Sequence, residues 1–506
     1  MSSSAVTTDA TPQSSPGFVK AMSLTDGTML VAGSMIGSGI FIVSASMARG
    51  LPSPMWLMIA WILSGIMTLL GALAYGEMAA MYPQAGGQYV FLRESMGNLM
   101  GFLYGWTFFV VIQTGTIAAV AVAFGKFMGV IFPVVSPEFF SWFPRADVCV
   151  AVLGCSDPAN AITLGLNPQR LVGLLSIAVL TWINLRGVRE GKFVQTSLTV
   201  VKTGALALLV LLGLTVGRHA EAIAANFSTG RFVGDWSLSY GLVVAFGAAM
   251  VGSLFSSDAW NSVTFAAAEV KNPSRNLPLA LVLGTGLVSL LYIVANVSYL
   301  SVLPYDGVAG AGDVVARGVR FATEDRVGTA VAETIFGASG GILMAIAILI
   351  STFGCNNGLI LSGARVLYAM ARDGVFFRKA GTLNRNHVPA FALIVQSVWT
   401  AILCLTGTYN QLLNYVIFAA LLFYVATTAG LFILRRTRAG VPRPYKALGY
   451  PVLPALYILL AAGVAVLLLL APTTRTESVS GLVLVLIGIP VFYIWRRAER
   501  PAVAAA

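Results

Sequence analysis

The sequence predicts an all-α integral membrane protein with about twelve transmembrane helices. Composition is the first reason: the 506 residues are 57% hydrophobic and 10% charged, whereas soluble domains carry about 25% charged residues. The mean hydropathy of +0.84 agrees. The third observation is a series of apolar segments of roughly twenty residues, the length that crosses a bilayer as a helix. They begin near Leu24, Met55, Met100, Leu171, Phe193, Leu238, Leu279, Gly340, Ala390, Leu412, Val452 and Gly481.

Both ends of the chain are predicted to lie in the cytoplasm. Residues 1–20 are rich in Ser, Thr and Pro without an apolar stretch, which is typical of a disordered tail and not of a signal peptide. An even number of spans places both termini on one side of the membrane. If that side is the cytoplasm, the cytoplasmic segments carry 20 Lys and Arg residues and the external segments carry 9. Because cytoplasmic loops are enriched in these residues, we expect a multi-pass protein of the cell (inner or plasma) membrane.

Several function classes are disfavoured. The net charge of +11 does not indicate a nucleic-acid partner, because the bias of cytoplasmic loops accounts for it. No zinc motif, phosphate loop or nucleophile elbow occurs. The spans offer an enzyme only Asp258, Lys202 and scattered hydroxyls, and they lack the repeated ring of carbonyl or acidic residues that a channel filter uses. We therefore expect no catalysis, metal, cofactor or pore.

The first apolar segment is weak at its centre. Val31–Ala45 reads VAGSMIGSGIFIVSA, and its Gly33-x-x-x-Gly37 spacing matches the packing motif of membrane helices. Tight packing needs small residues on one face only, however, and the consecutive run Gly37-Ser38-Gly39 goes around the helix. The run favours a local break in the helix over packing alone.

A second weak point lies five spans later. Span six contains Ser256-Ser257-Asp258 at its centre and Asn261 one turn on, and a carboxylate at mid-bilayer normally faces a cavity or a partner. Interrupted helices at corresponding positions of two five-helix halves point to a transporter binding site. A broken helix N-terminus can hold a carboxylate, and freed carbonyls can hold an ammonium. An α-amino acid carries both groups.

Four motifs in register resemble the amino acid–polyamine–organocation (APC) superfamily, most closely its L-type amino acid transporters and their bacterial relatives. They are GSMIGSGIF (33–41), YPQAGGQYVFLRESMG (82–97), LFSSDAWNSVTFAAAEVKNPSRNLP (254–278) and STFGCNNGLILSGARVLYAMARDG (351–374). The resemblance implies a LeuT-like fold of 5+5 inverted repeats, with helices 1 and 6 discontinuous. The repeats would span 21–215 and 236–436, followed by two further helices in 450–497 and a tail, 498–506.

The resemblance also implies a substrate site. Backbone and hydroxyl groups would bind the substrate carboxylate at Gly37, Ser38 and Gly39. Backbone carbonyls would bind its ammonium at Met35, Ile36 and Phe255. The Phe255 ring would close over the substrate from outside, although an ordinary core or lipid-facing aromatic is the alternative. Asn261 would line the pocket, and Asn357 would brace it.

Lys202 lies near the middle of the fifth span. By resemblance it occupies the position at which sodium-coupled relatives of this fold keep a sodium ion, and its ammonium would join span one to span eight through the matching hydroxyl, Ser351. A snorkelling side chain is disfavoured because Lys202 has no short route to water. Lys126, toward the outer end of span three, can reach water and is given no functional role.

Asp258 departs from the family pattern, in which many L-type relatives have glycine. Three interpretations stay open: attraction of a cationic substrate side chain, help in binding the α-ammonium, or pairing with Lys202 or a backbone donor away from the substrate. Glu269 lies near the cytoplasmic end of span six, where we expect it to fix the following loop through Arg275 or another basic neighbour.

Cys149 and Cys155 share the long loop between spans three and four. An oxidising exterior permits a disulfide between them, and two reduced thiols are the equal alternative. Animal relatives of the resembled family bond a single-span glycoprotein through this loop, but two neighbouring cysteines can bridge each other, so no such partner is implied. Cys355 and Cys404 fall within spans and are interpreted as packing residues.

The sequence therefore predicts a sodium-independent secondary transporter of L-α-amino acids, neutral ones above all, working by alternating access in the lipid bilayer. Exchange is favoured over proton symport, which would need Lys202 or Asp258 to titrate in the working range. A carrier of cationic amino acids or polyamines is the alternative that Asp258 and Glu269 suggest.

Overall fold

The computed structural model describes residues 18–135, 146–148, 162–234, 237–406 and 409–503. Ten helical segments in these ranges are long and apolar enough to cross a membrane, and three shorter apolar helices accompany them. The chain is a multi-pass membrane protein, as predicted. Beside the helices, the described residues form one short antiparallel pair, β1 (Ala146–Val148) with β2 (Ile162–Leu164). Cys149 and Cys155, for which a disulfide and two reduced thiols are the alternatives, lie outside the described residues.

The first half of the chain contains the following helices: α1 (Leu24–Met35), α2 (Gly39–Gly50), α3 (Pro54–Met81), α4 (Gln88–Met96), α5 (Asn98–Thr107), η1 (Phe108–Ile112), α6 (Gln113–Ile131), η2 (Pro133–Val135), α7 (Pro168–Arg186), α8 (Val188–Leu214), α9 (Ala220–Phe227) and α10 (Thr229–Val233). The second half contains α11 (Tyr240–Ser256), α12 (Ser262–Phe265), η5 (Ala267–Glu269), α13 (Pro273–Val302), α14 (Val314–Arg317), η6 (Thr323–Asp325), α15 (Val327–Phe336), α16 (Ala338–Arg372), η7 (Arg378–Gly381), α17 (Ala390–Thr406), α18 (Tyr409–Thr437), α19 (Val452–Leu470) and α20 (Arg475–Val503).

The helix starts follow local sequence signals. At α1, the Ser23 hydroxyl accepts the Asp26 backbone N–H while the Asp26 carboxylate accepts the Ser23 N–H, which satisfies two otherwise unpaired donors. Proline occupies the first turn of α3, α7 and α13, where no intrahelical N–H bond is lost.

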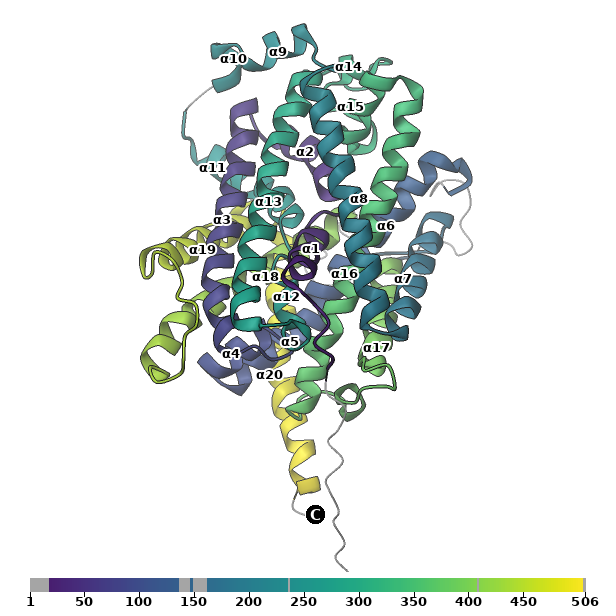
Figure 1. Ribbon diagram of the computed structural model, residues 1–506. Coiled ribbons are helices and arrows are strands. Elements are labelled where there is room, and N and C mark those ends of the chain that lie inside the picture. Colours follow the sequence, from purple (N-terminus) through teal and green to yellow (C-terminus); the bar gives the residue numbers. More distant parts are fainter. Residues whose placement is uncertain (1–17, 136–145, 149–161, 235–236, 407–408, 504–506) are drawn as a thin grey trace, which may run out of the picture.

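The centre of the bundle is built around the two interrupted segments, α1–α2 and α11–α12. Helix α13 packs along α3 and α8, α1 packs against α13, α8 and α16, and α16 packs against α6 (Figure 1). Helix α2 contacts α11 on the far side of the break. The second segment of each interrupted helix therefore meets the other half of the chain, which brings the two breaks together.

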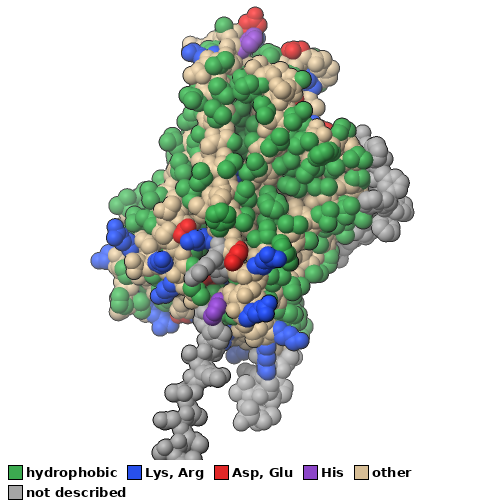
Figure 2. All heavy atoms as spheres, turned by 45° about the vertical axis from the view of Figure 1, so that its right-hand side comes forward, with side chains coloured by type: hydrophobic (Ala, Val, Ile, Leu, Met, Phe, Trp, Pro, Cys, Tyr) green, Lys and Arg blue, Asp and Glu red, His purple; other side chains and the backbone are tan. Residues whose placement is uncertain are grey.

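Both ends of the described chain lie at the same end of the bundle, called here the terminal end. The Phe18 ring lies 4.9 Å from the Tyr368 ring at the last turns of α16, and Trp495 of α20 lies 5.2 Å from Phe377, just after α16. Figure 2 shows Lys and Arg side chains gathered at this lower end, below a broad hydrophobic surface. An even number of spans requires this arrangement of the ends.

Ion pairs close the opposite end of the bundle. Arg49, at the end of α2, pairs with Asp325 at 2.6 Å, and the Lys126 ammonium of α6 donates to the Glu324 carbonyl at 2.7 Å. Glu324 and Asp325 both have positive φ, 51° and 63°. Lys126, interpreted from sequence as a snorkelling residue only, thus joins α6 to the loop that also holds α2.

Candidate functional site

The predicted break in the first helix is present. Helix α1 ends at Met35, Ile36 leaves the helical region with ψ of 92°, and α2 begins at Gly39. A Cβ atom on Gly39 would lie 2.9 Å from the Ser256 Cβ, and one on Gly37 would lie 3.2 Å from the Cys355 sulfur. The glycines therefore allow the connector between α1 and α2 to pass directly between α11 and α16.

Lys202 of α8 fills the carbonyl-rich end of α1. Its side chain is 1% exposed, and its ammonium donates to the carbonyls of Gly33 at 2.5 Å, Ile36 at 2.7 Å and Ser351 at 3.3 Å. The Ser351 hydroxyl donates to the Ile36 and Gly37 carbonyls at 3.1 and 3.0 Å. The fixed positive charge thus opposes the negative end of the α1 dipole, and it joins α1, α8 and α16.

Two further side chains donate hydrogen bonds to backbone carbonyls at the break, and sequence reasoning missed both. The Tyr292 hydroxyl of α13 donates to the Met35 carbonyl at 3.0 Å, and the Cys355 thiol donates to the Ser34 carbonyl at 3.0 Å. The carbonyls of Met35 and Ile36, expected to bind the substrate ammonium, therefore already accept donors from the protein. Each carbonyl oxygen has two lone pairs, so Met35 retains capacity for a second donor.

The predicted break in span six is also present. Helix α11 ends at Ser256, Ala259 takes a left-handed conformation with φ of 61°, and helical structure resumes at Ser262. The Phe255 carbonyl, a further predicted ammonium ligand, accepts the Asp258 N–H at 3.1 Å, and the Phe255 residue is 7% exposed. Because a left-handed non-glycine residue costs roughly 1–2 kcal/mol, the surrounding packing holds this break open.

Asp258 pairs with a phenol. Its carboxylate accepts the Tyr424 hydroxyl of α18 at 2.5 Å, and Asp258 is 7% exposed. Among the described residues the ammonium of Lys202 contacts carbonyls instead, so the two charges do not form the pair that one interpretation suggested. Sequence reasoning could not choose Tyr424 because it lies 166 positions from Asp258.

Two cavities meet at Asp258. Both are small, with internal volumes of about 10 and 20 Å³, and both are lined by Asp258, Ala420 and Tyr424. The first is lined in addition by Gln88, Tyr104, Phe108, Ile112, Gln113, Thr116, Ala259, Asn261, Ser262, Phe265 and Leu359. The second is lined in addition by Met67, Thr68, Leu254, Ser257, Trp260, Ile417, Leu421 and Tyr457. Neither lining includes Phe255 or a residue of the α1–α2 break.

Asn261 lies on the wall of the first cavity. Its amide donates to the Gln88 side chain at 2.9 Å, and the Gln88 amide donates to the Thr427 hydroxyl at 2.9 Å. The same wall contains η1, a π-helical turn whose residues Phe108 and Ile112 face the cavity. Such turns occur frequently at functional sites, and no sequence pattern signalled this one.

Asn357 lies away from both cavities. Its amide donates to the Gly191 carbonyl at 2.9 Å and to the Gln195 side chain at 3.1 Å, and its oxygen accepts the Asn184 amide at 2.9 Å. These bonds join α16 to α7 and α8, and α8 carries Lys202. Asn357 therefore positions the helices around the break and does not line the cavities.

The terminal end of the site is closed by main-chain and ionic contacts. Met22 and Val270 form a parallel bridge, in which the Met22 N–H donates to Glu269 at 2.9 Å and the Lys271 N–H donates to Met22 at 2.8 Å. The Glu269 carboxylate pairs with Arg365 at 2.9 Å, with the two side chains 0% and 1% exposed. The expected basic neighbour of Glu269 is thus Arg365 of α16.

The described residues contain no group of three or more His, Cys, Asp or Glu side chains that could hold a metal ion. The chemistry of the site instead comes from the ends of the interrupted helices. The N-terminus of α2 and the C-terminus of α11 face each other across the Gly39–Ser256 contact. Opposite helix ends present opposite partial charges, so the junction of the two breaks suits a zwitterion.

Known proteins resemble this chain along nearly its whole length. It is 30% identical to the serine/threonine exchanger SteT of Bacillus subtilis over 483 residues, 94% of this chain and 97% of the relative. It is 29% identical to the b(0,+)-type amino acid transporter 1 of Rattus norvegicus over 462 residues (91% and 84%) and to the human large neutral amino acids transporter small subunit 2 over 499 residues (96% and 83%). The amino acid permease family model matches residues 22–492. With both helix breaks inside that match, the chain belongs to the amino acid permease family.

Proposed function

We propose that the protein exchanges L-α-amino acids, neutral ones above all, across a cell membrane by alternating access and without sodium. The observation that carries this proposal is the ammonium of Lys202, which binds the carbonyls at the end of α1 and joins α1 to α16. A covalently attached cation occupies the position between carbonyl-rich helix ends at which a bound cation would otherwise be needed.

The substrate would lie between the two breaks. Its carboxylate would bind the N-terminus of α2 at Ser38 and Gly39, where helix N–H groups and the dipole favour an anion. Its ammonium would bind carbonyls at the C-terminal turn of α11, at and beside Phe255. The Phe255 ring would close the site from outside. In this arrangement Lys202 and Ser351 occupy the carbonyls of Gly33, Ile36 and Gly37. The substrate ammonium would then bind at the α11 end, with the remaining capacity of the Met35 carbonyl beside it.

Exchange, as opposed to net uptake, is supported by the relatives, one of which is itself named a serine/threonine exchanger. We further propose that 21–215 and 236–436 are the two inverted repeats and that 450–497 adds two peripheral helices. The concentration of Lys and Arg at the terminal end supports a cytoplasmic position for both termini (Figure 2). The protein would act without catalysis and without a heavy-chain partner.

The test uses purified protein in liposomes loaded with one unlabelled amino acid. Uptake of a labelled amino acid mixture is compared with and without the internal load, and with sodium replaced by choline. Uptake that requires the internal load and ignores sodium is the expected result. Sodium dependence would overturn the role given to Lys202, and uptake from empty liposomes driven by an inward proton gradient would make the protein a symporter.

A second candidate is exchange of cationic amino acids. Asp258 favours it, because this buried carboxylate lines both cavities and its side-chain hydrogen bond comes from the neutral hydroxyl of Tyr424. Competition of unlabelled arginine against labelled leucine separates the two candidates. Strong inhibition by arginine that disappears in Asp258→Asn would assign the carboxylate to the substrate side chain.

A further inference from the structure

Helix α8 holds α1 at three levels along the length of α1. At the start, the Lys192 ammonium donates to the Asp26 carboxylate at 2.9 Å and to the Ala21 carbonyl at 3.0 Å. At the middle, the Thr199 hydroxyl donates to the Met29 carbonyl at 3.3 Å. The far end is held by the second lysine of α8, described above for the break. The two ends of α1 are therefore each held by an ammonium group of the same neighbouring helix.

The two ammonium groups differ in their exposure to solvent. Lys202 is 1% exposed, and its ammonium donates to three backbone carbonyls. The Lys192 side chain is 29% exposed, and that of Asp26 is 13% exposed. Because water and salt weaken an exposed ion pair far more than a buried one, the contact at the start of α1 is the easier one to break. Helix α1 is thus held firmly at the break and loosely at its start.

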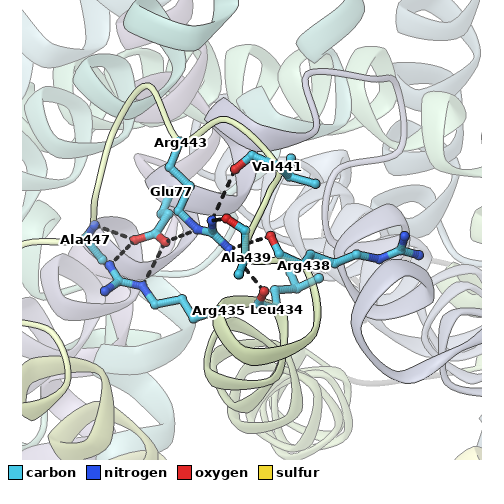
Figure 3. Close-up of polar contacts among 8 residues, drawn as sticks. All are labelled: Glu77, Leu434, Arg435, Arg438, Ala439, Val441, Arg443 and Ala447. Atoms are coloured by element: carbon cyan, nitrogen blue, oxygen red, sulfur yellow. Dashed lines mark hydrogen bonds and ion pairs between the residues drawn. The ribbon is translucent and has the colours of Figure 1, made fainter.

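Another carboxylate at the terminal end is held much more tightly than Asp26. Glu77 of α3 is 0% exposed and pairs with Arg435 at 2.5 Å and with Arg443 at 3.4 Å. It also accepts the Ala447 backbone N–H at 2.6 Å (Figure 3). Removing any one of these donors leaves the buried carboxylate with others. Among the described residues, Asp26 has a single cationic partner, so one side chain controls its contact with α8.

The start of α1 lies between the terminal end and the junction of the two breaks. The chain runs from Phe18 at the terminal end to Met35 at the break. On one side, the bridge between Met22 and Val270 joins it to the segment after α12 through main-chain hydrogen bonds, and these two residues are 2% and 1% exposed. On the other side, Lys192 joins it to α8. The α8 side is the weaker of the two, because its ion pair reaches solvent.

We propose that Lys192, with Asp26 and Ala21, forms a latch whose release opens the junction toward the terminal end. When the ammonium lets go, the start of α1 moves away from α8, and α1 pivots at the carbonyls held by Lys202. Thr199 lies between the latch and the pivot, so its contact with α1 opens with the latch. The inference rests on the alternating access proposed above, and it makes Lys192 a positioning residue for transport.

The test is the rate at which a water-soluble maleimide alkylates Thr199→Cys in the purified full-length protein in detergent, measured by mass spectrometry of its peptides. Position 199 is 0% exposed and should react only when α1 leaves α8. Lys192→Met should raise the rate about fivefold, the contribution of a partly exposed ion pair. Raising the ionic strength to about 1 M should also raise the rate while Lys192 is present. The same salt should have little effect in Lys192→Met.

Three controls separate the latch from general loosening. Lys192→Arg keeps a cation and should stay within about twofold of the parent rate. Ser23→Ala removes a hydroxyl that bonds to the same Asp26 carboxylate at 2.7 Å but leaves the ammonium in place. Its effect is confined to the first turn of α1, so it should also stay within about twofold. The native Cys404, which is 0% exposed in α17, reports unfolding and should stay unlabelled.

An unchanged rate in Lys192→Met overturns the proposal, and so does an equal rise in Ser23→Ala, which would reduce the effect to fraying of the helix start. If Lys192→Met exposes Cys404, the salt response of the protein that retains Lys192 decides the question, and a rate that ignores salt overturns the latch. The labelling needs no substrate. Absence of amino acid exchange in liposomes would therefore contradict the proposed function without altering the outcome of this test.

Discussion

Replacing Lys202 by methionine should slow amino acid exchange about 100-fold. The change keeps most of the side-chain volume but removes the donor to three carbonyls. In the variant the Ile36 carbonyl still accepts the Ser351 hydroxyl at 3.1 Å, and the Ser351 carbonyl lies within the helix α16. The Gly33 carbonyl is therefore the acceptor most affected by the loss of the ammonium. An unsatisfied buried acceptor costs about 1–3 kcal/mol, and a cation lost from a helix C-terminus costs up to about 2 kcal/mol. A middle value of about 3 kcal/mol corresponds to roughly 100-fold in rate.

The assay is exchange in preloaded liposomes, with detergent-solubilised thermal stability measured in parallel. Ser351→Ala should have a smaller effect than Lys202→Met, because the ammonium still reaches Ile36 at 2.7 Å. Lys126→Met is the matched control: it removes a lysine of α6 whose partly exposed pair with Glu324 contributes less than about fivefold. Wild-type exchange by Lys202→Met, or equal losses in Lys202→Met and Lys126→Met, would refute the reasoning.

Three further outcomes are expected. Gly39→Ala should abolish exchange because its Cβ would press against Ser256. A Cβ on Gly50, in the same helix, meets nothing within 4 Å, so Gly50→Ala should leave labelled amino acid uptake unchanged. Equal uptake by the two variants would contradict the close contact of the two breaks. Glu269→Gln should lower the melting temperature, since it leaves Arg365 buried without its counter-charge at a cost of roughly 3–5 kcal/mol. Adding Arg365→Met to Glu269→Gln should recover most of that loss, and no recovery would count against the pair. Glu77→Gln should also lower the melting temperature and should make the loop between α18 and α19 (residues 438–451) more accessible to protease. An unchanged cleavage pattern would show that the carboxylate does not hold this loop through the Ala447 N–H.

The two helix breaks could be predicted because local composition causes them. A run of Gly37, Ser38 and Gly39 goes around the helix, and a carboxylate at Asp258 cannot face lipid, so both signals lie within a few residues of the feature they produce. The breaks are present within one residue or two of these positions. The membrane-spanning helices could likewise be predicted, from the lengths of the apolar segments.

The partners across the bundle could not be predicted, because they depend on how distant helices pack. Asp258 bonds to Tyr424, and Glu269 pairs with Arg365, 96 positions away, although Arg275 lies nearer in the sequence. Any of the 16 tyrosines could have been the phenol. Lys202 differs from these residues, because its contact with the first helix was expected from the resemblance to a family and not from local sequence.

The bridge between Met22 and Val270 makes the two interrupted helices cooperative. Its two main-chain hydrogen bonds join the segment before α1 to the segment after α12, and at about 1 kcal/mol each they give a coupling free energy of about 2 kcal/mol. Neither segment can leave the terminal end alone without losing this coupling, so opening there is expected to be a joint event. No side-chain truncation removes these bonds. Met22→Pro deletes the N–H that donates to Glu269 and leaves the bond from Lys271 to the Met22 carbonyl, so it is expected to remove about half of this coupling.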